Sequence, residues 1–538
     1  MTTFYTNVQV YGSKILYRGL ENGKKIRGRV EYNPTLFVPA KKPTKFTTVT
    51  GEYVDRILPG NIRDCRDFVK QYEGVENFRI YGNQKYEYAF IADQHPQDVD
   101  WDMDHISVCN IDIEVGSENG FPEPDDAKEP ITAITYKMGD KFVVFGCGEF
   151  KNSRDDVQYI KCRDEIDLIK RFIDEWSGNY PDIITGWNVK LFDVPYIVNR
   201  IKRLLGEDEA KRLSPWNVLN EREVNFGPGR QFNTYVVLGI ASLDYIDLYQ
   251  RYAPEGKSQE SYKLDNIAHV ELGERKLSYE DYGNLHTLYR DNYQLFIEYN
   301  IKDVELIERL DDKLKLIELA LTLAYDSKTN YDDVFAQVRM WDALIYNHLR
   351  EKNMVLPPIT KHNKEAYVGA YVKEPKPGMY NWVASFDLNS LYPHLIMQYN
   401  ISPETLLEPK YYEDVHRNIL IRGIDVDRLL SQSISTDGLV GCTLTPNGQF
   451  FKTDKQGFLP EMMETMYNDR SKYKKKAIDA KKELELEKDP VKRFEIEKRI
   501  ARYNNLQLAK KVCLNSAYGA LGNEYFRFFD IRQASAIT

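Results

Sequence analysis

The chain has 538 residues, of which 42% are hydrophobic and 29% are charged. This length suffices for roughly three or four domains, and the 13% of aromatic residues excludes a disordered or linker-rich protein. The net charge of −9 argues against nucleic-acid binding over the whole surface, although a local basic face or bound metal ions remain compatible with it.

The first three segments of the chain have distinct patterns. Residues 1–104 alternate short β-type runs with Gly and Pro turns, which predicts a small β-rich N-terminal domain. In 105–335, strand-like runs such as HISVCNIDIEV and DIITGWNV mix with helical patterns, as is typical of an α/β domain. An amphipathic helix in 336–370, ended by the paired prolines of VLPPIT, predicts a connector that returns to the N-terminal domain.

The rest of the chain is expected to form three further segments. In 371–456, WVASFDL predicts a strand and SLYPHLIMQYN predicts a helix. Two long helical patterns in 457–523, broken at Asp489 and Pro490, predict an antiparallel helical hairpin. Residues 524–538 begin a last segment. The expected fold is therefore multidomain, of the α/β and α+β classes.

Acidic residues recur at informative spacings in 105–335. In NIDIEV, a strand would put Asp112 and Glu114 on one face, because side chains alternate with a period of two. In TGWNVKLFDVPYI, Asp193 comes at the start of a helix. In YNIKDVELIERL, Tyr299 and Asp303 are four residues apart and share a helix face.

Taken in chain order, these motifs resemble the three exonuclease motifs of the DEDDy nucleases: Asp112-x-Glu114, Asn188-x-x-x-Phe192-Asp193 and Tyr299-x-x-x-Asp303. The resemblance implies an RNase H-like 3′→5′ exonuclease domain whose four carboxylates are metal ligands. Four carboxylates can hold two divalent ions, about 4 Å apart, on either side of a scissile phosphodiester. Mg²⁺ is expected, two ions per active site, with Mn²⁺ as an alternative.

The resemblance also assigns roles to residues that hold no metal. The Tyr299 hydroxyl would orient the attacking water, and Asn188 would be supporting. LDYIDLY adds Asp244 and Asp247, but nothing in their spacing distinguishes ligands from structural acids, so neither is assigned.

VASFDLNSLYPHLIM carries an acidic residue at the end of an apolar run. It resembles motif A of the family B DNA polymerases, D-x-x-S-L-Y-P, in the residues Asp387, Leu388, Asn389, Ser390, Leu391, Tyr392 and Pro393. The resemblance implies that Asp387 binds both catalytic metals and that the Leu388 carbonyl helps to coordinate one of them. Tyr392 would pack beneath the sugar, and Ser390 and Leu391 would belong to the same substrate-binding segment. His394 departs from the small residue that is more usual there, which puts only the local packing in doubt.

KKVCLNSAYGALGN resembles motif B, K-x-x-x-N-S-x-Y-G, in the residues Lys511, Asn515, Tyr518 and Gly519. A helix puts the first three on one face, where the Lys511 ammonium could meet triphosphate oxygens. On the preceding helical pattern, Arg470 and Lys474 match the triphosphate-binding pair of the family.

The resemblance covers the whole chain and, more narrowly, the replicative polymerases of T-even-type tailed phages. NISPET and EYFRFFDIRQASAIT support the narrower match, and Tyr367-Val368-Gly369-Ala370 resembles the linker that contacts the template strand. It implies DNA-templated DNA synthesis with proofreading, with primer-template DNA and dNTPs as substrates. A sliding clamp would bind through a C-terminal part that this sequence lacks.

The third palm motif of the family, Tyr-Gly-Asp-Thr-Asp-Ser, does not occur in these 538 residues. A two-metal site with one aspartate is not expected to add nucleotides efficiently. Either the sequence is a fragment of a longer product, or a second polypeptide with the remaining palm and thumb completes a split polymerase. A stand-alone 3′→5′ exonuclease and a nonenzymatic nucleic-acid-binding module stay open as alternatives.

Cysteine usage and hydropathy indicate the compartment. The six cysteines form no Cys-x-x-Cys pair, which favours buried free thiols over zinc ligands. No apolar run approaches the about 20 residues of a transmembrane helix, and the N-terminus shows no signal-peptide pattern. We expect a cytoplasmic protein without membrane contact, in the host cell if it is viral.

Overall fold

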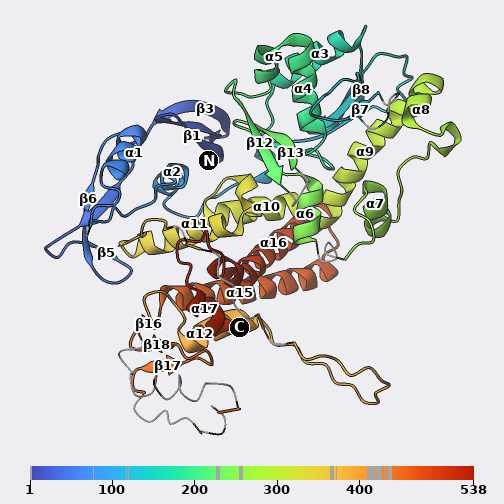
Figure 1. Ribbon diagram of the computed structural model, residues 1–538. Coiled ribbons are helices and arrows are strands. Elements are labelled where there is room, and N and C mark those ends of the chain that lie inside the picture. Colours follow the sequence, from blue (N-terminus) through green and yellow to red (C-terminus); the bar gives the residue numbers. More distant parts are fainter. Residues whose placement is uncertain are drawn as a thin grey trace. The chain divides into compact units, whose positions relative to one another are not determined.

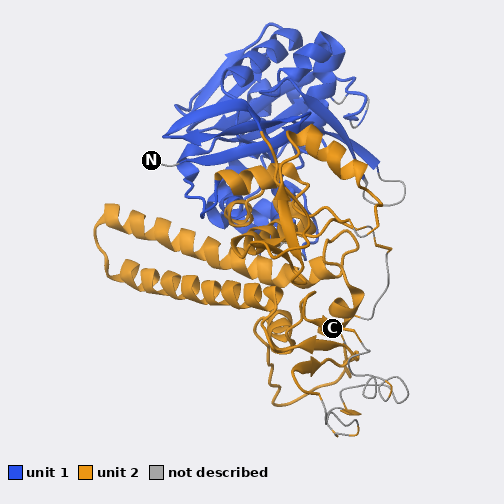
Figure 2. Ribbon diagram, turned by 90° about the vertical axis from the view of Figure 1, so that its left-hand side faces the viewer, with its two compact units in different colours: residues 1–31, 95–321, 330–332 blue, residues 32–94, 322–329, 333–538 orange. Residues whose placement is uncertain are grey.

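The computed structural model describes two compact units, which Figure 2 colours separately. Unit 1 comprises residues 1–31, 95–321 and 330–332, and unit 2 comprises residues 32–94, 322–329 and 333–538. The described residues are all except 1–2, 77, 117, 119, 121, 226–230, 254–257, 361, 364–368, 371, 409–416, 418–426, 429–430, 432 and 434–438.

Figure 1 labels the strands and helices where there is room. The strands are β1 (Phe4–Tyr11), β2 (Lys14–Glu21), β3 (Lys24–Glu31), β4 (Leu36–Pro39), β5 (Phe46–Thr48), β6 (Tyr53–Ile57), β7 (Val108–Val115), β8 (Ile131–Met138), β9 (Lys141–Gly146), β10 (Val157–Lys161), β11 (Ile183–Thr185), β12 (Leu219–Asn225), β13 (Gln231–Val237), β14 (Ala241–Ser242), β15 (Met354–Val355), β16 (Leu406–Leu407), β17 (Cys442–Leu444) and β18 (Phe450–Lys452). The helices are α1 (Ile62–Gln71), α2 (Tyr86–Gln94), α3 (Glu165–Gly178), α4 (Asp193–Leu205), α5 (Glu207–Lys211), α6 (Tyr245–Tyr252), α7 (Leu264–Leu272), α8 (Leu285–Asp291), α9 (Tyr293–Leu314), α10 (Leu316–Ser327), α11 (Gln337–Glu351), α12 (Leu391–Tyr399), α15 (Phe458–Leu486), α16 (Pro490–Leu521) and α17 (Ile531–Ile537), with short 3₁₀ turns at Met103–His105, Glu280–Tyr282 and Tyr331–Phe335.

A six-stranded sheet in the order β10-β9-β8-β7-β11-β14 organises unit 1. The β7–β8 and β8–β9 pairs are antiparallel, whereas β9–β10, β7–β11 and β11–β14 are parallel. Helices α3 and α4 bury one face of this sheet, and α9 packs on β7, β8 and β9 through a separate group of apolar side chains. The mixed α/β architecture expected for this part of the chain is confirmed.

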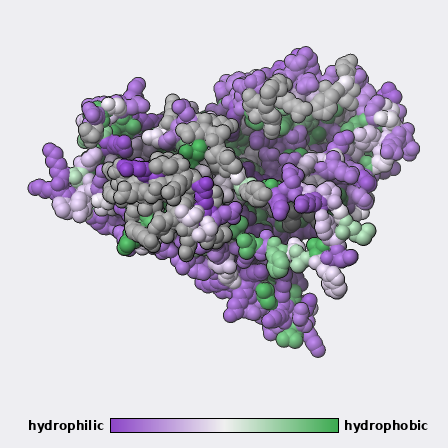
Figure 3. All heavy atoms as spheres, turned by 60° about the horizontal axis from the view of Figure 1, so that its bottom comes forward, coloured by the Kyte–Doolittle hydropathy of each residue, from purple (hydrophilic) through white to green (hydrophobic). Residues whose placement is uncertain are grey.

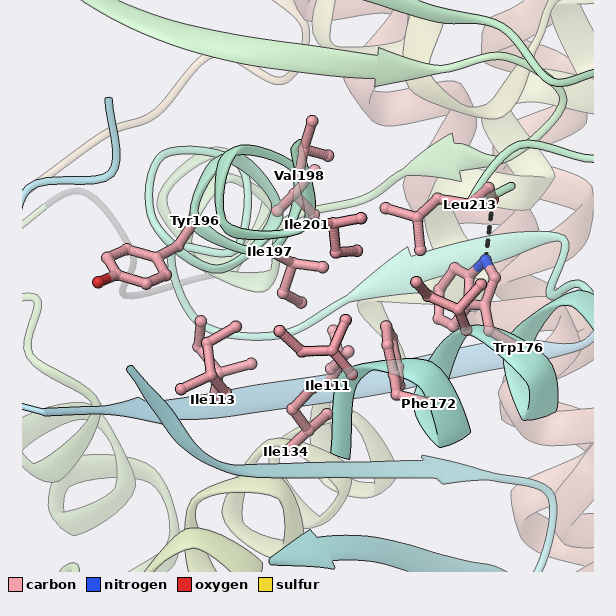
Figure 4. Close-up of a cluster of buried hydrophobic side chains, with 14 of the residues drawn as sticks. Ile111, Ile113, Ile134, Phe172, Trp176, Tyr196, Ile197, Val198, Ile201 and Leu213 are labelled. Atoms are coloured by element: carbon pink, nitrogen blue, oxygen red, sulfur yellow. Dashed lines mark hydrogen bonds between the residues drawn. The ribbon is translucent and has the colours of Figure 1, made fainter. Parts of the chain in front are cut away.

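Figure 4 shows the core between the sheet and α3 and α4. Phe172 and Trp176 of α3 and Ile197 of α4 point toward Ile111 of β7, and the Trp176 indole donates a hydrogen bond of 2.8 Å to the Leu213 carbonyl. Each such fully buried side chain contributes about 1.5–3 kcal/mol to folding. Because strand side chains alternate, the inward position of Ile111 leaves Asp112 on the α9 side.

The small antiparallel sheet β1-β2-β3 is tied to the rest of unit 1 through Asp182. Its carboxylate accepts hydrogen bonds from the Thr6 hydroxyl at 3.0 Å and the Lys25 ammonium at 2.9 Å, and Arg18 pairs with it at 3.2 Å. Burial would raise the pKa of Asp182, but the Arg18 and Lys25 charges outweigh burial and lower it. The carboxylate is therefore charged and fully paired.

Unit 2 contains the predicted helical hairpin, formed by α15 and α16, which pack against each other. Pro490 is the first residue of α16, and the Asp489 side chain caps the helix by accepting a hydrogen bond of 2.9 Å from the Val491 amide. Near its other end α16 is anchored by hydrogen bonds from Trp341 to Ser516 and from Lys510 to Asp326. The hairpin and its break at this Asp-Pro pair are confirmed.

The strand predicted in WVASFDL is not formed. The structure assigns no strand to residues 382–388, and the side chains of Trp382 and Phe386 are 101% and 93% exposed. A strand needs a neighbour to satisfy its backbone hydrogen bonds, and none of the described strands pairs with this segment. The prediction failed because local propensity does not supply that neighbour.

The hydrophilic surface and the free cysteine thiols are as the sequence predicts. Hydrophilic side chains dominate the face drawn in Figure 3, where apolar atoms form small separate groups. Within the described residues, no helix combines the length and the apolar character that a membrane span requires. All six cysteines are free thiols: Cys65, Cys109, Cys162 and Cys513 are buried, and Cys147 and Cys442 are partly exposed.

Candidate functional site

Three carboxylates meet between β7 and α9. Single carboxylate oxygens of Asp112, Glu114 and Asp303 all lie within 4.8 Å of one another. Strand β7 supplies the first two on one face, and α9 supplies the third. Glu114 and Asp303 are only 8% and 3% exposed. Closely spaced hard oxygen donors of this kind suit a divalent cation.

Asp193 lies at the edge of this carboxylate group. It is the first residue of α4, and its Oδ1 accepts a hydrogen bond of 3.0 Å from the Ile113 amide of β7. Its oxygens are not in the group gathered within 4.8 Å in the described part of the chain. Its charge nevertheless contributes to raising the pKa of Asp112 and Glu114, so the structure brings all four predicted carboxylates into one neighbourhood.

The loop that leads to Asp193 is held by Asp244, which was not assigned from the sequence. Asp244 caps α6, and its two oxygens accept hydrogen bonds of 2.9 Å from the amides of Asn188 and Lys190. Asn188 has a positive φ of 67°. Asparagine adopts this left-handed conformation more readily than most other residues do. Asp244 therefore has a structural role, because it fixes the backbone of this loop. The sequence did not predict this role, since it depends on contacts between distant segments.

Lys276 is the functional candidate that the sequence motifs missed. Its Nζ donates to Asp303 Oδ2 at 2.5 Å and to the Tyr299 hydroxyl at 3.2 Å. The Tyr279 ring packs edge-on against the Tyr299 ring, with 5.4 Å between the centroids. A group of buried carboxylates predicts some nearby cation, but no spacing in ERKLSYEDYG singles out which lysine supplies it.

Burial and mutual repulsion raise the pKa values of the carboxylates. Burial is the larger cause, and it combines with the neighbouring acids to raise the pKa of Asp112 well above its ordinary value and that of Glu114 to about 8. Burial likewise raises the pKa of Asp193 to about 7, and it raises that of Asp303 even though the Lys276 ammonium opposes it. A cation of higher charge would relieve this repulsion.

A second group of predicted residues lies in unit 2, where α12, α15 and α16 pack together. Arg470 of α15 donates from Nη1 to the Ser390 hydroxyl at 3.2 Å, just before α12 begins. The Tyr392 and Tyr518 rings meet edge to face, with 5.0 Å between centroids. These contacts bring motif A, motif B and the Arg470 helix into one neighbourhood.

His394, the departure from the family pattern, has packing partners. Its ring lies edge to face on Tyr467 of α15 at 4.8 Å, and its Nδ1 lies 2.9 Å from the Ser390 carbonyl oxygen. The remaining predicted residues of this site are exposed: Asp387, Leu388, Leu391, Lys474, Lys511, Asn515 and Gly519. Tyr367 and Val368 of the predicted linker lie outside the described residues.

Comparison with protein families identifies two matches that fit these two sites. Residues 61–267 match the exonuclease domain of DNA polymerase family B, and residues 332–538 match DNA polymerase family B. The first match includes Asp112, Glu114 and Asp193, whereas Tyr299 and Asp303 lie between the two matched ranges.

Similar curated proteins include the DNA-directed DNA polymerases of Escherichia phage RB69, 33% identical, and of Enterobacteria phage T4, 31% identical. Each alignment covers 100% of this chain and 65% of the relative, so the chain spans about two thirds of the length of these relatives. The DNA polymerase delta catalytic subunit of Candida albicans is 27% identical over 80% of this chain and 39% of its own length. With both of its matched regions from one family, in the order the motifs predict, the chain belongs to DNA polymerase family B.

Proposed function

We propose that this chain provides the 3′→5′ proofreading exonuclease and part of the polymerase site of a replicative, DNA-templated DNA polymerase. The observation that carries the proposal is a group of three carboxylates beside Lys276 and Tyr299, of which Glu114 and Asp303 are buried and Asp112 is partly buried. The proposed domains are the N-terminal domain 1–104, the exonuclease domain 105–335, the connector 336–370, the first part of the palm 371–456, the fingers 457–523 and a second palm segment from 524.

The carboxylate group fits divalent metal ions. Asp303 Oδ1 is buried and, among the described residues, has no hydrogen-bond partner, so a ligand atom is available. We propose that Asp112, Glu114, Asp193 and Asp303 hold two Mg²⁺ ions, or Mn²⁺ in their place. Bound there, the ions would supply a nucleophilic hydroxide and stabilise the departing 3′ oxygen.

The chain's own residues would then position the reactants. Tyr299 lies with its hydroxyl beside the carboxylates, where it can orient the attacking water by a hydrogen bond. Lys276 holds both Tyr299 and Asp303 through its ammonium. Burial would lower the pKa of this ammonium, but Asp303, Tyr299 and Asp112 together outweigh burial and raise it. Burial of these groups excludes bulk water and strengthens each electrostatic contact.

In the polymerase part we propose that Asp387 and the Leu388 carbonyl bind metal ions. The nucleotide would contact a set of residues on α12, α15, α16 and the turn before α12: Ser390, Leu391, Tyr392, Arg470, Lys474, Lys511, Asn515, Tyr518 and Gly519. The contacts from Arg470 to Ser390 and between Tyr392 and Tyr518 support a shared nucleotide site. Primer-template DNA and dNTPs are the proposed substrates.

We further propose that a second polypeptide supplies the remaining palm and thumb, and that a sliding clamp binds through that part. Met379, Trp382 and Phe386 are 96%, 101% and 93% exposed in a segment with strand-type sequence, so a strand from another source could pair with it. The 65% coverage of the phage relatives fits this arrangement and equally fits a longer chain of which the present sequence is a part. We propose the host cytoplasm as the location.

The first experiment is Mg²⁺-dependent digestion of a single-stranded oligonucleotide by the purified chain, alongside primer extension with four dNTPs. The oligonucleotide carries a label near its 3′ end. Replacing Asp112 and Glu114 by Ala should abolish cleavage and leave DNA binding largely intact, since these carboxylates hold metal rather than phosphate. Asp247→Ala is the matched control, because this acid pairs with Lys190 at 3.3 Å outside the carboxylate group.

The outcomes separate the candidate functions. Digestion without extension supports a working exonuclease with an incomplete polymerase site, and extension restored by a polypeptide with the missing aspartate supports the split polymerase. Digestion with no extension by the reconstituted pair favours a stand-alone exonuclease. Binding of DNA without either activity would favour a nonenzymatic module and contradict the proposal.

A further inference from the structure

One side chain in the exonuclease core touches the carboxylate group without carrying a charge. Asn300 follows Tyr299 on α9 and is fully buried. Its Nδ2 donates a hydrogen bond of 2.6 Å to Asp112 Oδ2. The amide nitrogen is the atom that suits a metal-bound Asp112, because a carboxylate that binds a metal ion is ionised and only accepts hydrogen bonds. Resting on the proposed exonuclease function, we infer that Asn300 is a positioning residue, which acts on the metal site by fixing the Asp112 carboxylate.

Among the described residues, Asn300 donates the hydrogen bond that holds the Asp112 carboxylate. Asp303 is held differently, by the Lys276 ammonium. A lysine on Asp112 would compete with a metal ion for its charge, whereas a neutral amide fixes the rotation of the carboxylate and leaves that charge available. The hydrogen bond occupies Oδ2, so Oδ1 remains free to bind metal.

The burial of Asn300 indicates a role other than stability. Its Oδ1 is buried and has no partner among the described residues, and a buried polar atom without a hydrogen bond destabilises the fold. Three neighbouring buried positions of α9 are apolar, Ile297, Ile301 and Val304, whereas Asp303 belongs to the carboxylate group. An apolar residue would therefore pack well at position 300, and the benefit of the amide lies in its contact with Asp112.

Asn110 offers a matched comparison within the same core. It lies two residues before Asp112 on β7, is 7% exposed, and also has an Oδ1 without a partner among the described residues. Its Nδ2 donates to the Val304 carbonyl at 2.7 Å rather than to a carboxylate. Asn110 thus shares the burial and the unsatisfied oxygen of Asn300 but does not touch a metal ligand.

The test is Mn²⁺ affinity, measured on the full chain by electron paramagnetic resonance of free Mn²⁺. All proteins carry Asp387→Asn, so that bound Mn²⁺ reports the exonuclease carboxylates. Removal of a residue that orients a metal ligand costs about 10- to 100-fold in metal affinity. Asn300→Leu, which keeps the number and branching of the side-chain heavy atoms but has no donor, should show that loss. Asn300→Ser, which keeps a shorter donor, should lose less, and Asn110→Leu should lower thermal stability with an unchanged Mn²⁺ affinity.

A double-mutant cycle assigns the effect to Asp112. In an Asp112→Asn background, Asn300→Leu should cause no more than a small further loss of Mn²⁺ affinity. Equal Mn²⁺ affinities of the Asn300 variants and their parent would overturn the inference, as would failure of both variants to fold while Asn110→Leu folds. Absence of Mn²⁺ binding by the parent itself would instead overturn the proposed metal site, and the inference with it.

Discussion

At the scale of single residues, burial makes the exonuclease carboxylates sensitive to pH. The pKa values of Glu114 and Asp193 are raised to about 8 and about 7, against about 4 in an unfolded chain. Between these values the folded state binds more protons than the unfolded state, so metal-free stability should fall as pH rises from about 4 to 8. Mg²⁺ should restore more stability at pH 8 than at pH 6, because it binds the ionised groups.

Thermal unfolding with chelator or with Mg²⁺, measured across this pH range, checks the prediction. The decline without metal should be smaller in a variant with Asp112→Asn and Glu114→Gln, since neither amide titrates. A decline of the same size in that variant would show that other groups cause it.

Gly186 lies between β11 and the loop that leads to Asp193, and its lack of a side chain allows a close approach to β7. A Cβ on Gly186 would lie 2.5 Å from the Ile111 carbonyl oxygen and 2.3 Å from a Val189 methyl. Gly186→Ala should therefore destabilise the protein by about 1–3 kcal/mol, as overpacking does. Urea unfolding measures the change. Gly178→Ala is the control, because a Cβ there meets nothing within 4 Å, and an equal effect of the two substitutions would contradict the steric argument.

At the scale of elements, a buried ion pair joins the segment after α16 to α11. Arg527 Nε lies 2.7 Å from Asp342 Oδ1, and the two side chains are 1% and 5% exposed. Arg527→Met would leave Asp342 buried without its partner, which should cost about 3–5 kcal/mol of unfolding free energy.

Denaturant titration of Arg527→Met, beside a surface control, tests this. Arg499 pairs with Glu483 on the α15–α16 hairpin, with side chains 46% and 55% exposed. Arg499→Met should cost at most about 1 kcal/mol. Similar costs for both variants would mean that burial does not govern the strength of these pairs.

At the scale of the whole molecule, exposed aromatic residues without secondary structure should be the first protease sites among the described residues. Trp382 and Phe386 lie in such a segment, whereas Trp341 and Phe450 are buried. Brief chymotrypsin treatment should cut within 379–388 first, as mass spectrometry of the fragments can show. Addition of the proposed second polypeptide should slow that cut, and early cleavage within α9 or α16 instead would contradict the exposure described.

Much of the molecule follows from its sequence by local rules. Period-two alternation places Asp112 and Glu114 on one strand face, helical spacing joins Tyr299 and Asp303, and the Asp489-Pro490 pair ends one long helix and starts the next. These patterns predict the structure correctly because they depend only on residues that are close together along the chain. The three exonuclease motifs and the two polymerase motifs could be recognised for the same reason.

Only the tertiary structure decided which distant residues meet. It brings Lys276 and Asn300 onto the carboxylates, assigns Asp244 to the loop before Asp193, and leaves the predicted strand at 382–388 without a partner. It also divides the first hundred residues between two units. These outcomes depend on packing between segments far apart in the chain, where burial and charge pairing, rather than local periodicity, set the free energy.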